Sequence, residues 1–242
     1  MILAVVAFMA PSASQVAADI QTHYAKQPQL TLEFEETVTH DIGKPQHSQG
    51  TLALARPASF RASYVRVVGT TRKPYRDFIY DGAKLWVVDY PNLEIHESTV
   101  PAAQLPTAAA FLLGGDLAKT YDLALTGAML VLTPKQPSAE VKELRLVVDP
   151  KTGDVTESVV VAPSGETSDF HFANPSTAKL APETLARDLK RYPNFKLTVM
   201  TAAPAAPAAP ATPAAPPKPA APAKPAAPAK PVTPGTSAPS KP

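Results

Sequence analysis

The stretch "GTLALARPASFRASY", Gly50–Tyr64, decides how this chain is interpreted. Its first half alternates like a half-buried strand, with Leu52 and Leu54 on one face. One further step at the same parity puts Arg56 on that apolar face, immediately before Pro57. A proline holds the preceding residue in extended backbone and removes a ladder donor. We therefore expect the strand to end or bulge at Arg56, with the cation directed inward.

Alternation with a period of two continues on both sides of this stretch. The sequence "LTLEFEETV" at 30–38 places Leu32 and Phe34 on one face, and "RDFIYDGAKLWVVDY" at 76–90 has Asp81-Gly82 between two apolar runs, a hairpin signal. Similar segments recur from 121 to 175, which predicts nine or ten antiparallel strands in one continuous meander. Because long flat edges aggregate, such a sheet must curl or close.

Three segments have helical rather than strand character. They are 15–25, with an apolar stripe at four-residue steps; 105–113, which is stopped by two glycines; and 182–192, with a proline in its first turn. Helices placed between strands can cover the concave side of a curled sheet. The sequence thus predicts one α+β domain over residues 15–200.

Both ends of the chain differ from this domain. Residues 1–14, "MILAVVAFMAPSAS", are typical of the apolar core of a secretory signal followed by small residues. No Lys or Arg precedes the core, so either the true start lies upstream or the segment is a buried helix. Residues 201–242 are almost entirely Pro, Ala and Lys, which predicts a disordered, polyproline-like tail. Its four lysines leave the rest of the chain with a net charge of −2, which gives no electrostatic argument for binding nucleic acid.

The sequence offers little to a catalytic interpretation. Cysteine is absent, which excludes disulfides, thiol chemistry and cysteine metal sites, and argues against anchoring through a lipidated cysteine. No nucleophile elbow, H-E-x-x-H or P-loop pattern occurs, and the five histidines are dispersed. Glu35 and Glu36 should lie on opposite strand faces, so they cannot share one site. His171, between two phenylalanines, should face the polar side of its strand. We expect no enzyme, no metal and no cofactor.

The segments "LTLEFEETV", "GTLALARPASFRASY", "YDGAKLWVVDYPNLEIHE", "AAFLLGGD" and "LVLTPK" together resemble the LolA family of periplasmic lipoprotein carriers. The R-P-x-x-F-R element, the D-G-x-x-L-W hairpin and the L-T-P-K strand follow in the same order at similar spacing. The resemblance runs from the first helix to about Phe172. It fails at "RYPNFKLTV", where the family usually has a different final strand, and in the tail.

The resemblance implies an incomplete, strongly curved antiparallel β-barrel, a half-barrel, covered by short helices that form a lid. It implies a periplasmic carrier that holds the acyl chains of lipoproteins released from the inner membrane and delivers them to the outer membrane. The implied partners are acylated lipoproteins, an inner-membrane lipoprotein-releasing ABC transporter and an outer-membrane acceptor. No catalysis, cofactor or nucleic acid is implied, and we expect a monomer.

A soluble carrier of acyl chains must supply a dry apolar cavity, because each exposed CH₂ costs about 0.8 kcal/mol in water. The residues expected to line it are Leu32, Phe34, Leu52, Leu54, Phe60, Phe78, Trp86, Phe111 and Leu112. The alternative is that they fill an ordinary core. Both faces of "LWVV" are apolar, so the pattern does not decide whether Leu85 or Trp86 faces the ligand.

Arg56 and Pro57 are interpreted as a latch between barrel and lid. A cation on an apolar face needs acceptors, and the free carbonyls at the end of the 105–113 helix would supply them. The latch would close the empty cavity and break when acyl chains displace the helix. The alternative is an arginine that snorkels at the rim.

Two other functions compete with the carrier. One is a lipid-sensing or glycolipid-binding envelope protein of the same fold. The other is a structural module of the cell envelope that works through its tail.

Overall fold

The computed structural model describes residues 11–68, 70–100, 110–113 and 115–200. The first ten residues of the predicted signal, most of the predicted 105–113 helix and the predicted tail lie outside the described residues.

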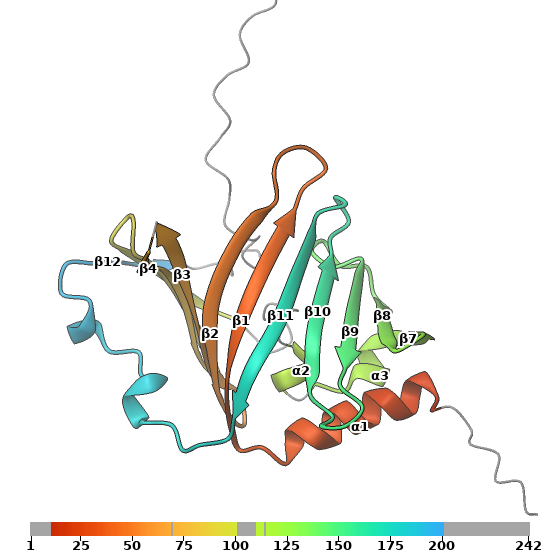
Figure 1. Ribbon diagram of the computed structural model, residues 1–242. Coiled ribbons are helices and arrows are strands. Elements are labelled where there is room, and N and C mark those ends of the chain that lie inside the picture. Colours follow the sequence, from red (N-terminus) through yellow and green to blue (C-terminus); the bar gives the residue numbers. More distant parts are fainter. Residues whose placement is uncertain (1–10, 69, 101–109, 114, 201–242) are drawn as a thin grey trace, which may run out of the picture. The chain divides into compact units, whose positions relative to one another are not determined.

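The described part consists of strands with a few short helical segments (Figure 1). The helical segments are α1 (Ala13–Ala25), α2 (Ala110–Leu113), α3 (Leu117–Thr120) and the 3₁₀ turns η3 (Pro182–Thr184) and η4 (Leu189–Arg191). The strands are β1 (Gln29–Thr39), β2 (Gln46–Ala55), β3 (Ser59–Val68), β4 (Thr71–Asp81), β5 (Lys84–Asp89), β6 (Glu94–Thr99), β7 (Tyr121–Thr126), β8 (Met129–Pro134), β9 (Glu143–Val148), β10 (Val155–Val161), β11 (Thr167–Ser176) and β12 (Lys196–Met200).

Within the described residues, twelve strands form one open, curved sheet whose end strands, β12 and β7, do not pair with each other. The order is β12-β6-β5-β4-β3-β2-β1-β11-β10-β9-β8-β7. This is not the single meander expected from the sequence. Two meanders, β1–β6 and β7–β11, are joined at the centre by antiparallel pairing of β1 with β11. The long strand β1 can make this joint because it pairs along its length on both sides.

Apolar side chains lie in rows across the inner face of strands β1 to β5. The first row is Leu30, Leu54, Phe60, Tyr80 and Leu85, paired in register from strand to strand. The next is Leu32, Leu52, Ala62, Phe78 and Val87. All of these residues belong to one hydrophobic cluster or pack against it. Burying each large aliphatic or aromatic side chain contributes about 1.5–3 kcal/mol.

The helices pack on this inner face. In α1, Ala17, Ile20 and Tyr24 are buried at the spacing of one helical face, and the Ser12 side chain caps the helix by accepting from the Gln15 amide. The Tyr24 hydroxyl accepts from the Val155 amide at 2.8 Å, which fixes the end of α1 to the start of β10. In α2, Phe111 and Leu112 are almost fully buried in the same cluster.

The segment after β11 covers part of the outer face (Figure 1). The predicted helix at 182–192 is instead two 3₁₀ turns, because Asp188 is extended and its side chain accepts from the Lys190 amide in competition with a helix. β12 then pairs parallel to β6, whereas we expected antiparallel strands throughout. Tyr192 packs there with Ile79, Trp86, Val88 and Ile95 in a second cluster.

Candidate functional site

The apolar interior brings together nearly all of the residues predicted to line a cavity. They are Leu32, Phe34, Leu52, Leu54, Phe60, Phe78, Phe111 and Leu112, each buried within one cluster. They come from β1, β2, β3, β4 and α2, and the same cluster extends to α1, to α3 and to strands β8–β11 in the other half of the sheet.

Trp86 does not share this face, and its prediction as a cavity residue is wrong. It lies in the second cluster, where its indole Nε1 donates to Glu97 Oε2 at 2.6 Å and Arg187 lies over its ring at 5.4 Å. Leu85 takes the inner position instead. Both faces of β5 are apolar because the inner face packs in the interior and the outer face is covered by the segment between β11 and β12, which contains Arg187 and Tyr192.

Aromatic rings connect the lid side of the interior to the sheet. Tyr24 of α1 contacts Phe111 of α2 with ring centroids 5.7 Å apart, and Phe111 contacts Phe172 of β11 at 6.1 Å. The path continues through ring pairs at 4.9–6.2 Å that link Phe172, Phe170, Phe34, Tyr64 and Phe78. A displacement of α2 would therefore break a specific ring contact with the sheet.

Gly50 permits this aromatic packing. It lies in register between Phe34 and Tyr64, and a Cβ at Gly50 would overlap the Phe34 ring and the Ser63 carbonyl oxygen. The missing side chain lets the Phe34 ring cross over β2.

Arg56 joins the end of β2 to two helices. β2 ends at Ala55, and the Arg56 guanidinium Nε donates to the carbonyl oxygens of Tyr24 at 3.0 Å and Gln27 at 3.1 Å. Its Nη2 donates to the Leu112 carbonyl of α2 at 2.7 Å.

The Tyr24 and Leu112 carbonyls lie in the last turns of α1 and α2, where helix-end carbonyl oxygens favour a cation, and Gln27 lies just beyond the end of α1. Burial lowers the pKa of Arg56 from its usual value, but a guanidinium remains protonated in proteins. The peptide bond between Arg56 and Pro57 is cis.

The inner face becomes polar toward the opposite ends of these strands. The third row contains Phe34, Gly50, Tyr64, Arg76 and Asp89. One step further along β1, Glu36 takes the inward position in register with Ser48 and Phe170 and is only 3% exposed. Burial, followed by the charge of Glu166, raises the pKa of Glu36 to about 7.

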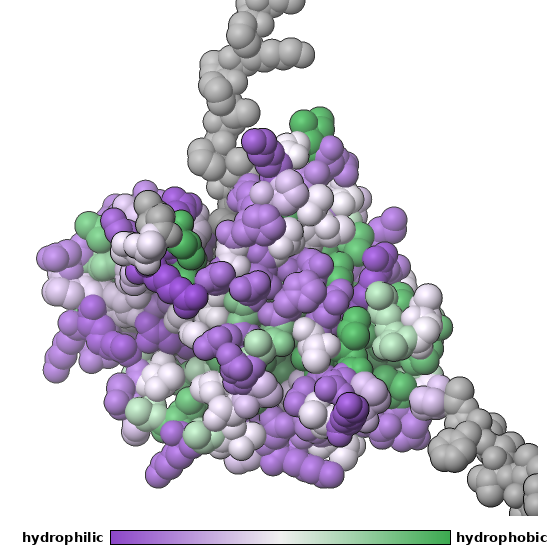
Figure 2. All heavy atoms as spheres, viewed as in Figure 1, coloured by the Kyte–Doolittle hydropathy of each residue, from purple (hydrophilic) through white to green (hydrophobic). Residues whose placement is uncertain are grey.

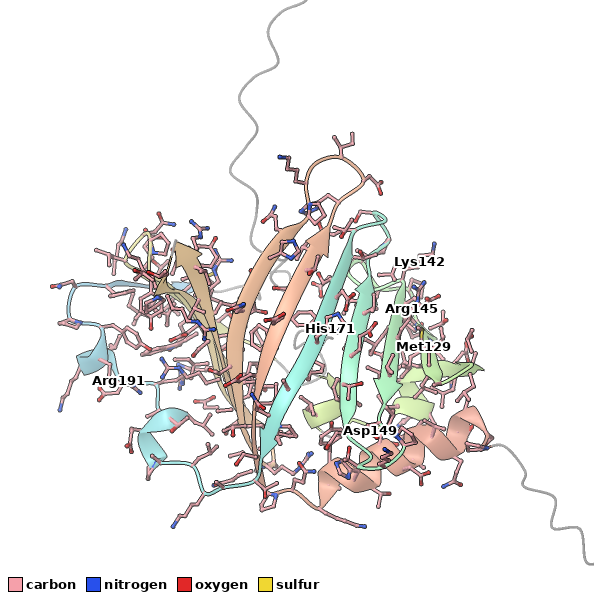
Figure 3. All side chains as sticks on the ribbon, viewed as in Figure 1. Met129, Lys142, Arg145, Asp149, His171 and Arg191 are labelled. Atoms are coloured by element: carbon pink, nitrogen blue, oxygen red, sulfur yellow. The ribbon has the colours of Figure 1, made fainter. Side chains whose placement is uncertain are left out.

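Away from the second cluster, the outer face is polar. Figure 2 shows mostly hydrophilic residues on the side toward the viewer, and His171 projects from that side of β11 in Figure 3. His171 is exposed while Phe170 is buried, as predicted. A pocket on this face, about 280 Å³ in volume, has charged walls that include Glu33, Arg72 and His171, which makes it unsuited to an acyl chain.

No group of three or more His, Asp or Glu side chains that could hold a metal occurs in the ranges that the structure describes. Among the same residues, no helix is both long and apolar enough to cross a bilayer.

The sequence did not reveal two parts of the site. The α1 carbonyls that accept from Arg56 leave no trace in residue types, because every residue has a carbonyl. The second is the burial of Glu36: its parity with Leu32 and Phe34 predicts the inner face, but Phe170, its partner in register, comes from a strand more than a hundred residues away.

Comparison with known proteins identifies the family. The model of the family "Outer membrane lipoprotein carrier protein LolA" matches residues 25–187. An outer-membrane lipoprotein carrier protein of Chromobacterium violaceum is 28% identical over 57% of this chain and 66% of its own length. One from Glaesserella parasuis is 28% identical over 69% of this chain and 78% of its own. A crystal structure of an uncharacterized conserved protein from Thermus thermophilus aligns with a TM-score of 0.51 at 11% identity, covering 77% of this chain and 100% of that one, which shows a shared fold.

Proposed function

This chain belongs to the LolA family of outer membrane lipoprotein carrier proteins, and we propose that it carries acylated lipoproteins across the periplasm, holding their acyl chains in its apolar interior. In this role it takes cargo from an inner-membrane lipoprotein-releasing ABC transporter and passes it to an outer-membrane acceptor. It performs no catalytic step and acts as a monomer. The observation that carries the proposal is the apolar interior, which faces short helices in place of a second sheet.

The chemistry of the cargo supports this role. An acyl chain in water costs about 0.8 kcal/mol for each exposed CH₂, so transfer between membranes requires an apolar container. The two apolar rows lie side by side across β1 to β5, and apolar side chains of α1 and α2 pack against the same cluster. Cargo would enter by moving α2 off the sheet, so that acyl chains take the place of the Phe111–Phe172 contact.

Arg56 is the proposed latch of the empty state. Its bond to the Leu112 carbonyl ties α2 to the sheet, and its bonds to Tyr24 and Gln27 tie α1 to the same point. When acyl chains displace α2, the bond to Leu112 is lost while those to α1 can persist. The recovery of that bond favours release of cargo to the acceptor.

Binding of lipidated and unlipidated forms of one lipoprotein tests the carrier function. The parent protein should bind only the lipidated form. Binding of that form should displace the apolar dye 1-anilinonaphthalene-8-sulfonate (ANS) from the protein. Leu54→Glu places a charge in the first apolar row and should abolish both activities, since burying an unpaired carboxylate costs several kcal/mol. Ile42→Glu, at a 93% exposed position, is the matched control. Equal binding of the two lipoprotein forms would contradict the carrier function and favour a structural module.

Arg56→Leu tests the latch. The variant retains an apolar filler but has no donor for the helix carbonyls, so it should fold and load lipidated cargo. Transfer to an acceptor membrane should be at least tenfold slower, because the closed empty state has lost a charged hydrogen bond worth about 1.5–3 kcal/mol. Loading and transfer rates equal to those of the parent would refute the latch.

A further inference from the structure

The polar end of the inner face contains a buried acceptor atom without a partner. Glu36 occupies the same face of β1 as Leu32 and Phe34 and is 97% buried. Its Oε2 accepts no hydrogen bond from any residue that the structure describes. A buried polar atom without a partner is costly, so its presence in a folded protein calls for a specific explanation, and a bound group that supplies the missing partner is one.

A buried donor without a partner lies on the other side of Tyr64. Arg76 is in register with Tyr64 on the inward parity of β4, and its Nη2 donates to Asp89 at 3.3 Å. Its Nε, however, is buried and has no partner among the described residues. The aromatic ring of Tyr64, 4.9 Å from Phe34 and 5.7 Å from Phe78 between centroids, is held between the two polar groups.

Glu36, Tyr64 and Arg76 act on one another electrostatically. Burial raises the pKa of Tyr64 well above its usual value, the Glu36 charge raises it further, and Arg76 lowers it. The raised pKa of Glu36 leaves much of this carboxyl protonated at neutral pH, so it can donate as well as accept.

We propose that Glu36, Tyr64 and Arg76 form a subsite for the uncharged ester or amide linkage of an acyl ligand, whose chains lie along the apolar rows below. This proposal rests on the carrier function and specifies which part of the cargo the polar end recognises. Glu36 lies on β1 and Arg76 on β4, with two strands between them, so each contacts a different carbonyl of the ligand. One carbonyl oxygen accepts from Arg76 Nε, and another accepts from the protonated Glu36 carboxyl. An amide N–H, where present, donates to Glu36.

The charges at this end favour a neutral linkage over an ion. The Arg76 guanidinium disfavours a cationic ligand group, while the nearby Glu166 and the ionised fraction of Glu36 disfavour an anionic one. Carbonyl oxygens can accept from the Arg76 guanidinium and from the protonated Glu36 carboxyl, whereas hydrocarbon can satisfy neither group. Tyr64 and Arg76 lie in the third row, two rows from the first apolar row, which contains Leu54. Arg56 lies on the opposite side of that first row, at the other end of the strands. Head group and latch are therefore separated along the strands.

The test uses two synthetic lipopeptides that compete with bound ANS. One has a diacylglyceryl group with two ester carbonyls; the other is its dialkyl ether with chains of equal length. The parent should prefer the ester by about tenfold, the effect of one to two hydrogen bonds from buried groups. Glu36→Leu and Arg76→Met should each reduce this preference to within twofold while retaining affinity for the ether. Glu36→Gln should keep part of the preference, because its amide can still donate.

Glu35→Leu is the matched control, since it removes a carboxylate from the outer face of the same strand. It should leave the preference unchanged. Equal displacement of ANS by both lipopeptides from the parent would overturn the subsite while leaving the carrier function in place. Failure of both lipopeptides to displace ANS would overturn the carrier function and the subsite with it.

Discussion

Replacing Glu36 by Gln should change how the stability of the protein depends on pH. The pKa of Glu36 is raised to about 7 in the folded state, chiefly by burial, against 4.5 for an ordinary glutamate. Between these two pH values the folded state holds a proton that the unfolded state has released. The free energy of unfolding therefore falls as the pH rises, by about 1.4 kcal/mol per pH unit and about 3 kcal/mol in total.

Glutamine cannot titrate, so the variant lacks this loss of stability. Relative to the parent, Glu36→Gln should gain about 3 kcal/mol between pH 4 and pH 8, with most of the gain between pH 5 and pH 7. The parent-minus-variant difference isolates Glu36 from its titrating neighbours: Glu166, the His40 that pairs with Glu166 at 2.6 Å, and Tyr64.

Urea unfolding at pH 4, 6 and 8 measures this difference. The fluorescence of Trp86, the single tryptophan, reports on unfolding from the other side of the sheet. The slope of the free energy of unfolding against urea concentration should be equal for both proteins, so that the urea concentration at the midpoint alone reports the difference in stability. Glu35→Gln should show no pH-dependent difference. Parallel stability curves for parent and Glu36→Gln from pH 4 to 8 would refute the interpretation of Glu36 as a buried carboxyl whose pKa is raised by desolvation.

Two further substitutions test the sheet by the same urea assay. Gly50→Ala should lower the free energy of unfolding by about 1–3 kcal/mol, because the new methyl group overlaps the Phe34 ring. The control, Gly115→Ala, has open space around the new methyl group and should change the free energy of unfolding by less than about 0.5 kcal/mol. Equal effects of the two substitutions would contradict the close contact between Gly50 and Phe34. Asp77→Leu should lower the free energy of unfolding by about 3 kcal/mol, because it removes the buried carboxylate that pairs with the part-buried Arg61 guanidinium and accepts from the Tyr90 hydroxyl. Adding Arg61→Leu should recover part of that loss. A double variant no more stable than Asp77→Leu alone would argue against this ion pair.

Local rules predicted the inner face of the sheet well. Period-two alternation assigned Leu32, Leu52 and Phe60 to one side, and the structure places all three in one cluster. The parity argument for Arg56 relied on the same rule, and the residue does reach the carbonyl of Leu112. The assignment of side chains to one face succeeded because it depends on neighbours within a few residues in the sequence, whereas the carbonyl that Arg56 reaches lies 56 residues away.

The errors arise where distant segments meet. The side of β5 that Trp86 faces is set by the C-terminal segment, which lies about a hundred residues later in the chain and supplies Arg187 and Tyr192. The direction of β12 is similarly set by its pairing with β6, since its own five exposed residues are compatible with either direction. The joining of two meanders through β1 and β11 depends on a pairing of strands more than a hundred residues apart.

The open sheet has a mechanical consequence. A closed barrel has its radius fixed by the number of strands and their stagger, so it cannot widen without breaking ladder hydrogen bonds. Here β12 and β7 are unjoined, so small changes in twist at each of eleven strand interfaces can add up to a change of curvature with every ladder intact. The sheet can therefore flatten or curl elastically as one unit. Its resistance to opening comes from the side-chain contacts across the inner face and from the Arg56 hydrogen bonds to the helices. These contacts, more than the backbone hydrogen bonds, set the size of the ligand that the sheet can accommodate.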